Sequence, residues 1–258
     1  MPEHKNGKNR NPSVTEFLSR NDHQFRKTEA LVYIPAYDEE DTIADIITRI
    51  RQICGFDILV IDDGSNDKTP EILKTLDVDI LRRVNGWGSR IIDGLEVGYA
   101  LGYSYVIKID GDGQHDPHDI QRLYELATST GTDIVIGSRH LKQFTGSKTW
   151  VAGQGMRFCS ALVKFILKQR VTDTTSGLKI WNHHACEVSI QAFRNGKLKQ
   201  GSTYHVEELI IAARNGLKIK EVDVVMHPRE FGESKSFNRK ELFIFPLQLL
   251  RSTFRALT

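Results

Sequence analysis

Short apolar segments alternate with amphipathic segments along the first half of the chain. Five apolar segments have the length and composition of buried strands: 31–34, 57–61, 78–81, 105–109 and 133–137. The spacing of apolar residues and the capping residues between them predict helices over 41–53, 70–76, 89–101 and 118–129. Because the predicted strands carry few polar residues on either face, the pattern indicates an α/β fold, a mostly parallel sheet flanked by helices.

The second half of the chain is less regular. We expect helices over 156–167, 183–193 and 205–214, with loops over 139–153 and 171–177. Residues 217–226 alternate between apolar and polar side chains, as in a half-exposed strand. The elements predict one domain over 29–239, in which a second half, 139–239, is built onto the sheet of the first half, 29–138.

The two ends of the chain differ in character. Residues 1–28 are polar and predict a flexible arm, with a short helix near 13–18 because Ser13 and Glu16 have the spacing of a capping box. Residues 240–258 gather leucine, phenylalanine and arginine into a predicted amphipathic helix. Two interpretations of this helix stay open: it lies in a membrane interface, or it packs on the domain or on a second copy in a homodimer.

Composition narrows the functional classes. A net charge of +2 is too small to indicate nucleic-acid binding, and 40% hydrophobic residues are ordinary for a globular protein. Three dispersed cysteines argue against a disulfide framework or a structural zinc site. With no signal peptide and no long apolar run, we expect a cytoplasmic protein, in peripheral contact with the membrane if its tail binds there.

Three predicted strands end in polar, turn-forming clusters, at 35–39, 62–65 and 110–114. In parallel sheets, ligands bind beyond the carboxyl ends of the strands. We therefore expect the chemistry of this protein where these three clusters meet.

The last cluster holds two carboxylates two positions apart, Asp110 and Asp112, with Gly111 between them and Gln114 after them. Such a pair at a strand end suits Mg²⁺ or Mn²⁺ bridged to phosphate oxygens, with Gln114 as a neutral third ligand. A calcium loop fails because His115 and Gln121 stand where that loop needs glycine and glutamate. A haloacid-dehalogenase-like phosphatase with Asp110 as nucleophile stays open.

The other two clusters have polar side chains suited to a nucleoside. Asp62 and Asp63 can hydrogen-bond a base or ribose, and Tyr37 can stack on it beside Glu39. A second interpretation is equally open, in which Asp62 only orients its loop and the acids after Pro35 and Ala36 begin a helix.

Taken together, the three segments resemble the large family 2 of inverting glycosyltransferases, most of all its branch of polyprenyl- or dolichyl-phosphate mannose and glucose synthases. The segments read Ile-Pro-Ala-Tyr-Asp-Glu-Glu at 34–40, Val-Ile-Asp-Asp-Gly-Ser-Asn-Asp at 60–67 and Ile-Asp-Gly-Asp-Gly-Gln-His-Asp-Pro at 109–117. The resemblance implies a GT-A fold with a nucleotide-binding half, 29–138, and an acceptor half, 139–239. It also implies a nucleotide-sugar donor, such as a UDP- or GDP-sugar.

The resemblance also implies residue roles. Nucleotide-sugar binding falls to Pro35, Ala36, Tyr37, Glu39, Asp62, Asp63, Arg90, Asp110 and Gly111, and the metal to Asp110, Asp112 and Gln114. Gly-Ser-Arg at 137–139 makes Arg139 a candidate for binding the acceptor phosphate, together with Arg157, and 171–177 matches a loop near the sugar site. Arg229, Gly232, Ser234 and Lys235 match a basic segment of the family; Ser234 is assigned to the acceptor, and Arg229 and Lys235 to catalysis.

One segment departs from the family pattern. Where the family has Asn-x-Gly-Lys-Gly-x-Ala, this chain reads Asn-Gly-Trp-Gly-Ser-Arg-Ile at 85–91. Trp87 then takes the place of the lysine. Two explanations stay open: Arg90 supplies the missing positive charge, or the donor differs from the usual one of the family.

The implied chemistry is displacement at the anomeric carbon with inversion. The metal on Asp112, with Arg229 and Lys235, would stabilise the leaving nucleoside diphosphate. A lipid phosphate acceptor is already an anion and needs no general base, whereas a glycan hydroxyl needs a carboxylate. The candidate bases are Asp173, Glu207 and Glu208, and a salt-bridge role is the alternative for each. A non-catalytic nucleotide-sugar-binding protein is the remaining alternative.

Overall fold

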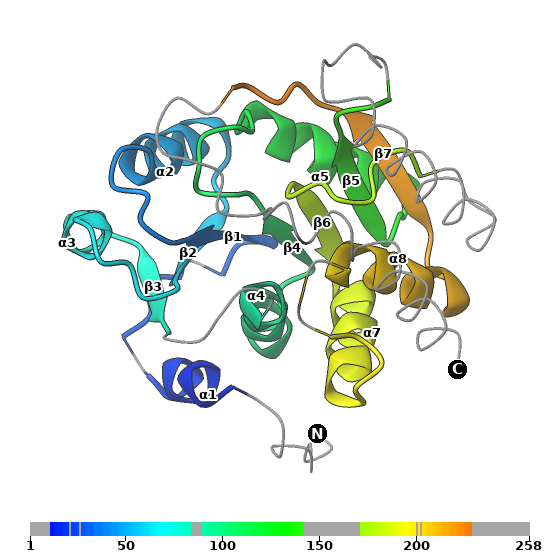
Figure 1. Ribbon diagram of the computed structural model, residues 1–258, viewed down its shortest axis with the longest axis horizontal. Coiled ribbons are helices and arrows are strands. Elements are labelled where there is room, and N and C mark those ends of the chain that lie inside the picture. The colour runs from blue at the N-terminus through cyan, green and yellow to red at the C-terminus, as the bar shows by residue number, and fades with distance from the viewer. Residues whose placement is uncertain are drawn as a thin grey trace, which may run out of the picture.

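The computed structural model describes residues 11–20, 22–25, 27–83, 89–141, 171–199, 201 and 203–228. Within these ranges, a seven-stranded sheet has the order β3-β2-β1-β4-β6-β5-β7 (Figure 1). The strands are β1 (Ala30–Ala36), β2 (Asp57–Asp62), β3 (Asp79–Arg82), β4 (Tyr105–Lys108), β5 (Ile134–Ser138), β6 (Lys179–Asn182) and β7 (Ile219–Asp223). The predicted α/β class is confirmed.

The sheet is parallel apart from one strand. β1 pairs in parallel with β2 and β4, β2 with β3, and β5 with β7. β6 runs antiparallel between β4 and β5. The sequence pattern did not predict β6, because this short strand follows a polar loop and has a lysine, Lys179, at its first position.

Helices cover both faces of the sheet, and Figure 1 shows α2 and α5 on one side with α1, α4 and α7 on the other. The helices are α1 (Pro12–Ser19), α2 (Ile43–Ile53), α3 (Thr69–Thr75), α4 (Ser89–Ala100), α5 (His118–Thr130), α7 (His183–Arg194) and α8 (Tyr204–Arg214). Each face has its own apolar core. Residues of α1, α4, α7 and α8 line one core, and residues of α2, α3 and α5 line the other.

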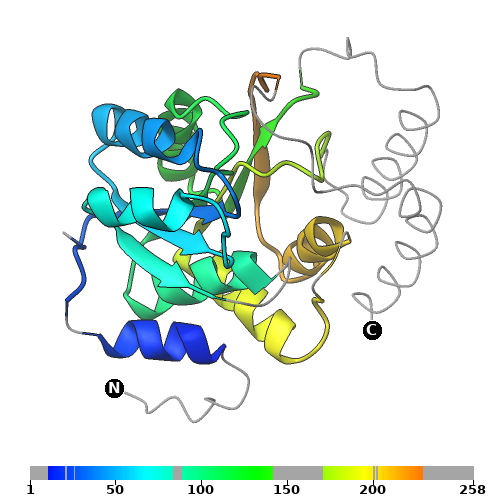
Figure 2. The same ribbon diagram turned by 60° about the vertical axis from the view of Figure 1, so that its left-hand side comes forward.

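Part of the predicted N-terminal arm belongs to the folded domain, so the prediction of a flexible arm is wrong for this part. α1 contacts α4 and β3 (Figure 2), and its Val14 and Phe17 are 0% and 3% exposed. The predicted capping box is also wrong. The side chain of Asn11 caps the helix by accepting from the backbone N–H of Ser13, and a proline follows Asn11 at the first helical position.

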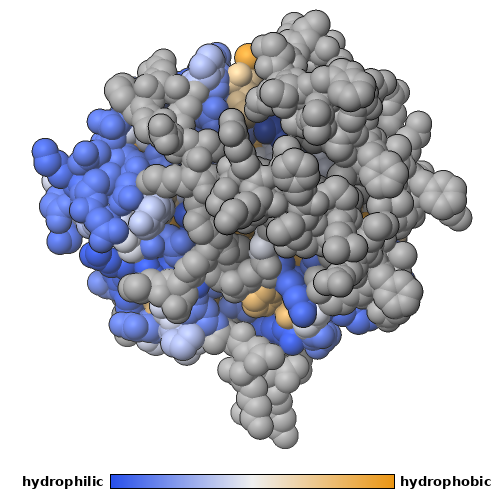
Figure 3. Space-filling model, viewed as in Figure 1, coloured by the Kyte–Doolittle hydropathy of each residue, from blue (hydrophilic) through white to orange (hydrophobic). Residues whose placement is uncertain are grey.

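Several predicted elements lie outside the described residues: the start of the arm (1–10), the helix over 156–167 and the amphipathic helix over 240–258. Hydrophilic side chains dominate the described surface at the α3 end of the molecule, on the left in Figure 3. Among the described helices, none is long and apolar enough to cross a membrane.

We expect Phe17→Ala to lower the free energy of unfolding by about 3 kcal/mol, because it removes a buried ring from the core that α1 shares with α4. Urea denaturation would measure the change. The exposed neighbour Glu16 provides the control, since Glu16→Ala should stay within about 0.5 kcal/mol of the unaltered protein. Equal stability of both variants would show that α1 contributes nothing to the core.

Candidate active site

The three polar clusters meet at one edge of the sheet, because β1, β2 and β4 are parallel neighbours. Hydrogen bonds then join their loops. The N–H of Glu39 donates to the Thr69 hydroxyl (2.9 Å), and the N–H of Asn66 donates to the Asp38 carboxylate (2.8 Å). The hydroxyl of Thr42 donates to the carbonyl of Gly111 (2.6 Å). The structure therefore brings together the clusters that the sequence predicts to converge.

The side of the site beyond β2 is rich in charge. Asp62 is buried, and its carboxylate accepts a hydrogen bond from the backbone N–H of Ser65 (2.9 Å), which orients its own loop. The nucleotide-binding role of Asp62 stays a prediction. The Asp63 carboxylate lies 3.5 Å from Arg90 and 3.8 Å from Arg83. Burial lowers the pKa of Arg90, and the nearby carboxylates oppose this shift. Arg90 thus stands beside a predicted nucleoside ligand, while Trp87 lies outside the described residues.

The end of β1 presents both backbone and side chains to the site. Ala36 is buried, and its carbonyl accepts from the N–H of Asp63 (3.0 Å). Pro35, Tyr37 and Glu39 are partly exposed beside it. Their nucleoside-binding roles stay predictions.

Asp110 is held in place from two sides. The Lys108 ammonium donates to Asp110 Oδ1 and also to the carbonyl of Gly177 (3.1 Å). A Cβ added at Gly177 would lie 1.7 Å from Asp110 Oδ2, so only glycine fits there. Burial by itself would raise the pKa of Asp110, but Lys108 and His115 outweigh it and lower the pKa to about 2.

The loop after Asp110 docks on the segment that follows β7. Gln114 exchanges hydrogen bonds with His227: its carbonyl accepts from the His227 N–H (2.8 Å), and its side-chain amide donates to the His227 carbonyl (3.2 Å). His115 and Met226 form an isolated bridge beside them. The basic segment of Arg229, Gly232, Ser234 and Lys235 begins two residues after His227 and lies outside the described residues.

The carboxylates in the described part of the site suit a metal ion that also binds the phosphates of a substrate. Asp112 is partly exposed, and its carboxylate accepts a hydrogen bond from the backbone N–H of Gln114 (3.2 Å). Within the described ranges, no three His, Cys, Asp or Glu side chains are grouped to hold an ion by themselves. Mg²⁺ at such sites takes one or two carboxylates and completes its shell with water and substrate phosphate. Asp112 fits this pattern better than Asp110, because Lys108 already occupies Oδ1 of Asp110.

Arg139 and Asp173 form the main ion pair on the other side of the site. The guanidinium contacts both carboxylate oxygens, at 2.6 and 2.7 Å, and also donates to the hydroxyl of Thr175 (2.8 Å). Burial would raise the pKa of Asp173, but hydrogen bonds from Arg139 lower it to about 2. This pair fixes the loop over 171–177 to the end of β5. Arg157 lies outside the described residues, and acceptor binding by Arg139 stays a prediction.

For two of the three candidate bases, Asp173 and Glu208, the structure shows the salt bridge of the alternative interpretation, and Glu207 accepts hydrogen bonds instead. Asp173 binds Arg139. Glu207 is buried and accepts from the Thr203 hydroxyl (2.7 Å) and the Lys199 N–H (3.0 Å). Glu208 is buried against the Lys179 ammonium (3.2 Å).

Sequence reasoning missed three residues at this edge, Lys108, Lys179 and His205, and it named Gly177 only as part of the loop over 171–177. The available signal was weak. It consisted of two lysines, Lys108 and Lys179, each of which stands in a short apolar segment next to the site. A charge inside a buried strand needs a partner, and this requirement was the clue.

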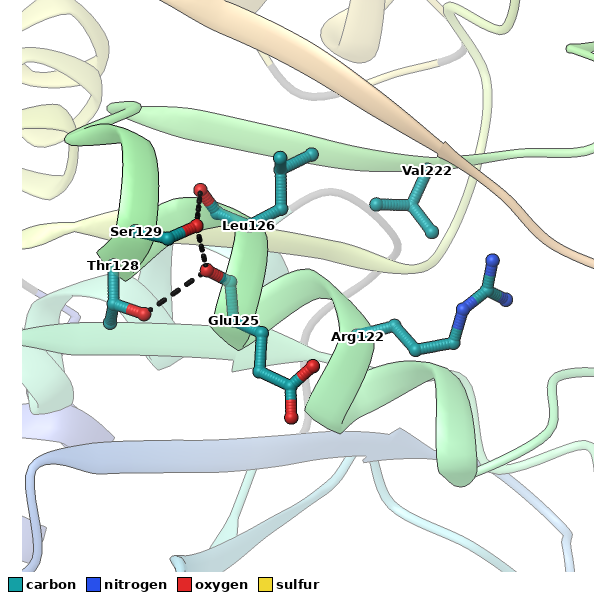
Figure 4. A pocket seen from close by; sticks show the side chains of 6 residues that line it. All are labelled: Arg122, Glu125, Leu126, Thr128, Ser129 and Val222. Carbon is teal, nitrogen blue, oxygen red and sulfur yellow. Dashed lines mark hydrogen bonds between the residues drawn. The ribbon is translucent and has the colours of Figure 1, made fainter.

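A surface hollow of about 540 Å³ lies elsewhere, between the later turns of α5 and β7 (Figure 4). Arg122, Glu125, Leu126, Thr128, Ser129 and Val222 line it. The hydroxyls of Thr128 and Ser129 bond back to carbonyls of their own helix. None of the predicted site residues lines this hollow, so it has no part in the site.

Known proteins are similar to this chain in sequence. A polyprenol monophosphomannose synthase of Mycolicibacterium smegmatis is 29% identical over 80% of this chain and 80% of its own. A UDP-N-acetylglucosamine–dolichyl-phosphate N-acetylglucosaminyltransferase of Methanococcus voltae is 29% identical over 81% of this chain and 91% of its own.

A solved structure shares the fold. Glucosyl-3-phosphoglycerate synthase of Mycobacterium tuberculosis, in complex with Mn²⁺, UDP-glucose and phosphoglyceric acid, superposes with a TM-score of 0.63 at 19% identity. The match covers 96% of this chain and 85% of that one, and it confirms the predicted GT-A fold.

A match to a protein-family model shows which family the chain belongs to. The model described as glycosyl transferase family 2 matches residues 31–189, which is more than half of the chain and includes the three clusters at the strand ends. The chain therefore belongs to glycosyl transferase family 2 and is a nucleotide-sugar-dependent glycosyltransferase.

Proposed function

We propose that this enzyme transfers a sugar, with inversion and with Mg²⁺ or Mn²⁺, from a nucleotide sugar to a polyprenyl phosphate. The observation that carries the proposal is the state of the three candidate bases. Asp173 and Glu208 are each engaged in an ion pair, and Glu207 is buried and accepts hydrogen bonds from the Thr203 hydroxyl and the Lys199 N–H. A hydroxyl acceptor requires a base to take its proton, whereas a phosphate acceptor is already an anion.

The surroundings of Arg139 support a lipid acceptor. Within the described residues, the exposed large hydrophobic side chains are Leu141 and Val225, at 41% and 65% exposure. They follow the ends of β5 and β7, which are parallel neighbours, so both lie at the same edge of the sheet as Arg139. A cation beside exposed apolar side chains suits a phosphate that carries a hydrocarbon chain. The names of the relatives, which act on polyprenol and dolichyl phosphates, agree with this acceptor.

The nucleotide-sugar donor is assigned to the side of the site that lies away from Arg139. Tyr37, Asp63 and Arg90 would hold the nucleoside, and Asp112 with Gln114 would hold the metal at the diphosphate. A divalent cation bound there would offset the charge that develops on the leaving diphosphate. Mn²⁺ and UDP-glucose are present in the fold relative from Mycobacterium tuberculosis. Arg229 and Lys235, which follow the docked His227, would add positive charge to the same group.

The fixed position of Asp110 counts against the phosphatase alternative. A nucleophilic aspartate needs an oxygen that is open to a substrate phosphorus. Here Lys108 binds Oδ1, and the backbone of Gly177 lies against Oδ2. Asp110 is better suited to orienting the donor than to attacking it.

Transfer to polyprenyl phosphate is directly testable. Incubation of the enzyme with Mn²⁺, undecaprenyl phosphate in detergent micelles and a labelled UDP- or GDP-sugar should give a labelled product that extracts into organic solvent. Undecaprenol without phosphate serves as the control acceptor and should give none. Label that appears only on an added oligosaccharide would assign the enzyme to glycan hydroxyls instead.

We expect Asp112→Asn to lower kcat/KM by roughly 10²- to 10³-fold, the usual cost of losing one group that stabilises charge in the transition state. The variant should also lose Mn²⁺-dependent binding of the free nucleoside diphosphate in calorimetry. Asp45→Asn makes the same chemical change on the exposed surface of α2 and should leave both measurements unchanged. Full activity in the Asp112 variant would exclude this carboxylate as the metal ligand.

We expect Gly177→Ala to lower the transfer rate roughly 10-fold or more, because the new methyl group displaces the Asp110 carboxylate. Gly55→Ala is the matched control, since a Cβ there meets nothing within 4 Å. Thermal unfolding of both variants separates loss of activity from loss of fold. A fully active Gly177 variant would mean that the position of Asp110 is not critical.

A further inference from the structure

A row of polar side chains crosses the sheet beneath the site. Tyr33 of β1 pairs with Lys108 of β4, and Lys108 pairs with Lys179 of β6. Paired positions on neighbouring strands point to the same face. The three residues are 0%, 5% and 0% exposed, on the face that α4, α7 and α8 cover. Two lysines therefore stand directly opposite each other in the interior, where like charges repel.

Each lysine has its own carboxylate. Lys108 binds Asp110, and Lys179 binds Glu208 of α8 at 3.2 Å. Glu208 also accepts from the indole N–H of Trp181 (3.0 Å) and the hydroxyl of Tyr204 (3.2 Å). These bonds hold the first turn of α8 against β6. His205 lies on the same turn and is positioned with it.

The contact of His205 with Lys179 determines the tautomer of its ring. The Lys179 ammonium lies 3.2 Å from His205 Nδ1, and an ammonium only donates hydrogen bonds. Nδ1 therefore accepts, and the proton of the neutral ring is on Nε2. Burial, followed by repulsion from Lys179 and Lys108, lowers the pKa of His205 well below its ordinary value, in agreement with a neutral ring.

His205 is near carboxylates from both sides of the site. The residue is partly exposed, and the charges of both Asp110 and Asp173 act on its ring. Nε2 makes no hydrogen bond to another residue in the described part of the chain. His205 therefore provides an oriented N–H donor near both carboxylates, without a protein partner among the described residues.

We propose that the His205 Nε2–H group donates a hydrogen bond to a hydroxyl of the transferred sugar and so contributes to sugar selectivity. This inference rests on the proposed function, in which the diphosphate binds near Asp110 and the acceptor near Arg139 and Asp173. The transferred sugar must lie between the leaving phosphate and the acceptor. We expect an N–H donor near both Asp110 and Asp173 to reach the sugar, and a site with a fixed donor favours sugars that offer it an oxygen.

The test compares binding of a nucleotide sugar with binding of its free nucleoside diphosphate, by calorimetry with Mn²⁺ and without acceptor. The probes are UDP-glucose, UDP-N-acetylglucosamine and GDP-mannose, each with UDP or GDP as its partner. His205→Phe keeps a ring but removes the N–H. It should weaken binding of the preferred nucleotide sugar roughly 10- to 100-fold and leave binding of the free diphosphate unchanged. His205→Gln retains an amide N–H and should recover most of the affinity.

His184→Phe is the matched control, because His184 is 60% exposed on the surface of α7. Unchanged sugar binding in His205→Phe would overturn the inference. Equal weakening of the nucleotide sugar and the free diphosphate would overturn it as well, since that result indicates a contact with the diphosphate or a structural role. The calorimetry is done without an acceptor. Its result therefore stays interpretable even if the enzyme does not use polyprenyl phosphate as its acceptor.

Discussion

The site depends on how two opposed lysines are neutralised inside the sheet. Lys108 and Lys179 face each other across β4 and β6, and a buried ammonium is tolerated only with a close counter-charge. Lys108 takes Asp110 from the end of its own strand, and Lys179 takes Glu208 from α8. These two ion pairs orient the first carboxylate of the loop over 110–114 and dock the helix that carries His205. The same ion pairs thus stabilise the sheet and shape the floor of the site.

A second set of contacts makes the rim of the site rigid. Asp38, Glu39 and Thr42 from the first loop form hydrogen bonds to the segments after β2 and β4, and these bonds tie the three segments together. The docking of His227 on Gln114 ties the segment after β7 to the same rim. Groups held in this way stabilise charge without first having to reorganise, which is where much of the catalytic effect of such sites originates.

The sequence predicted the parallel strands and their helices well, because apolar runs and helical spacing report burial directly. It also predicted that the strand-end clusters converge, since parallel neighbours end at one edge. β6 was missed because Lys179 interrupts a short apolar run, and a charge is normally a sign of exposure. The burial of α1 was missed because two apolar residues, Val14 and Phe17, stand in a polar segment. The contacts of Lys108 with Gly177, of Asp173 with Arg139 and of Glu208 with Lys179 join residues far apart in the sequence, which local pattern does not contain.

The proposed phosphate acceptor is supported by the ion pairs that the carboxylates near the site already form. An aspartate whose pKa is about 2 because Arg139 binds it, as in Asp173, is a weak base at neutral pH. Freeing it would leave Arg139 unpaired and release the loop over 171–177, which also carries the glycine that lies against Asp110. Proton abstraction by Asp173 would therefore disturb the donor side of the same site. An acceptor that arrives as an anion avoids this conflict, and a phosphate meets that condition where a sugar hydroxyl does not.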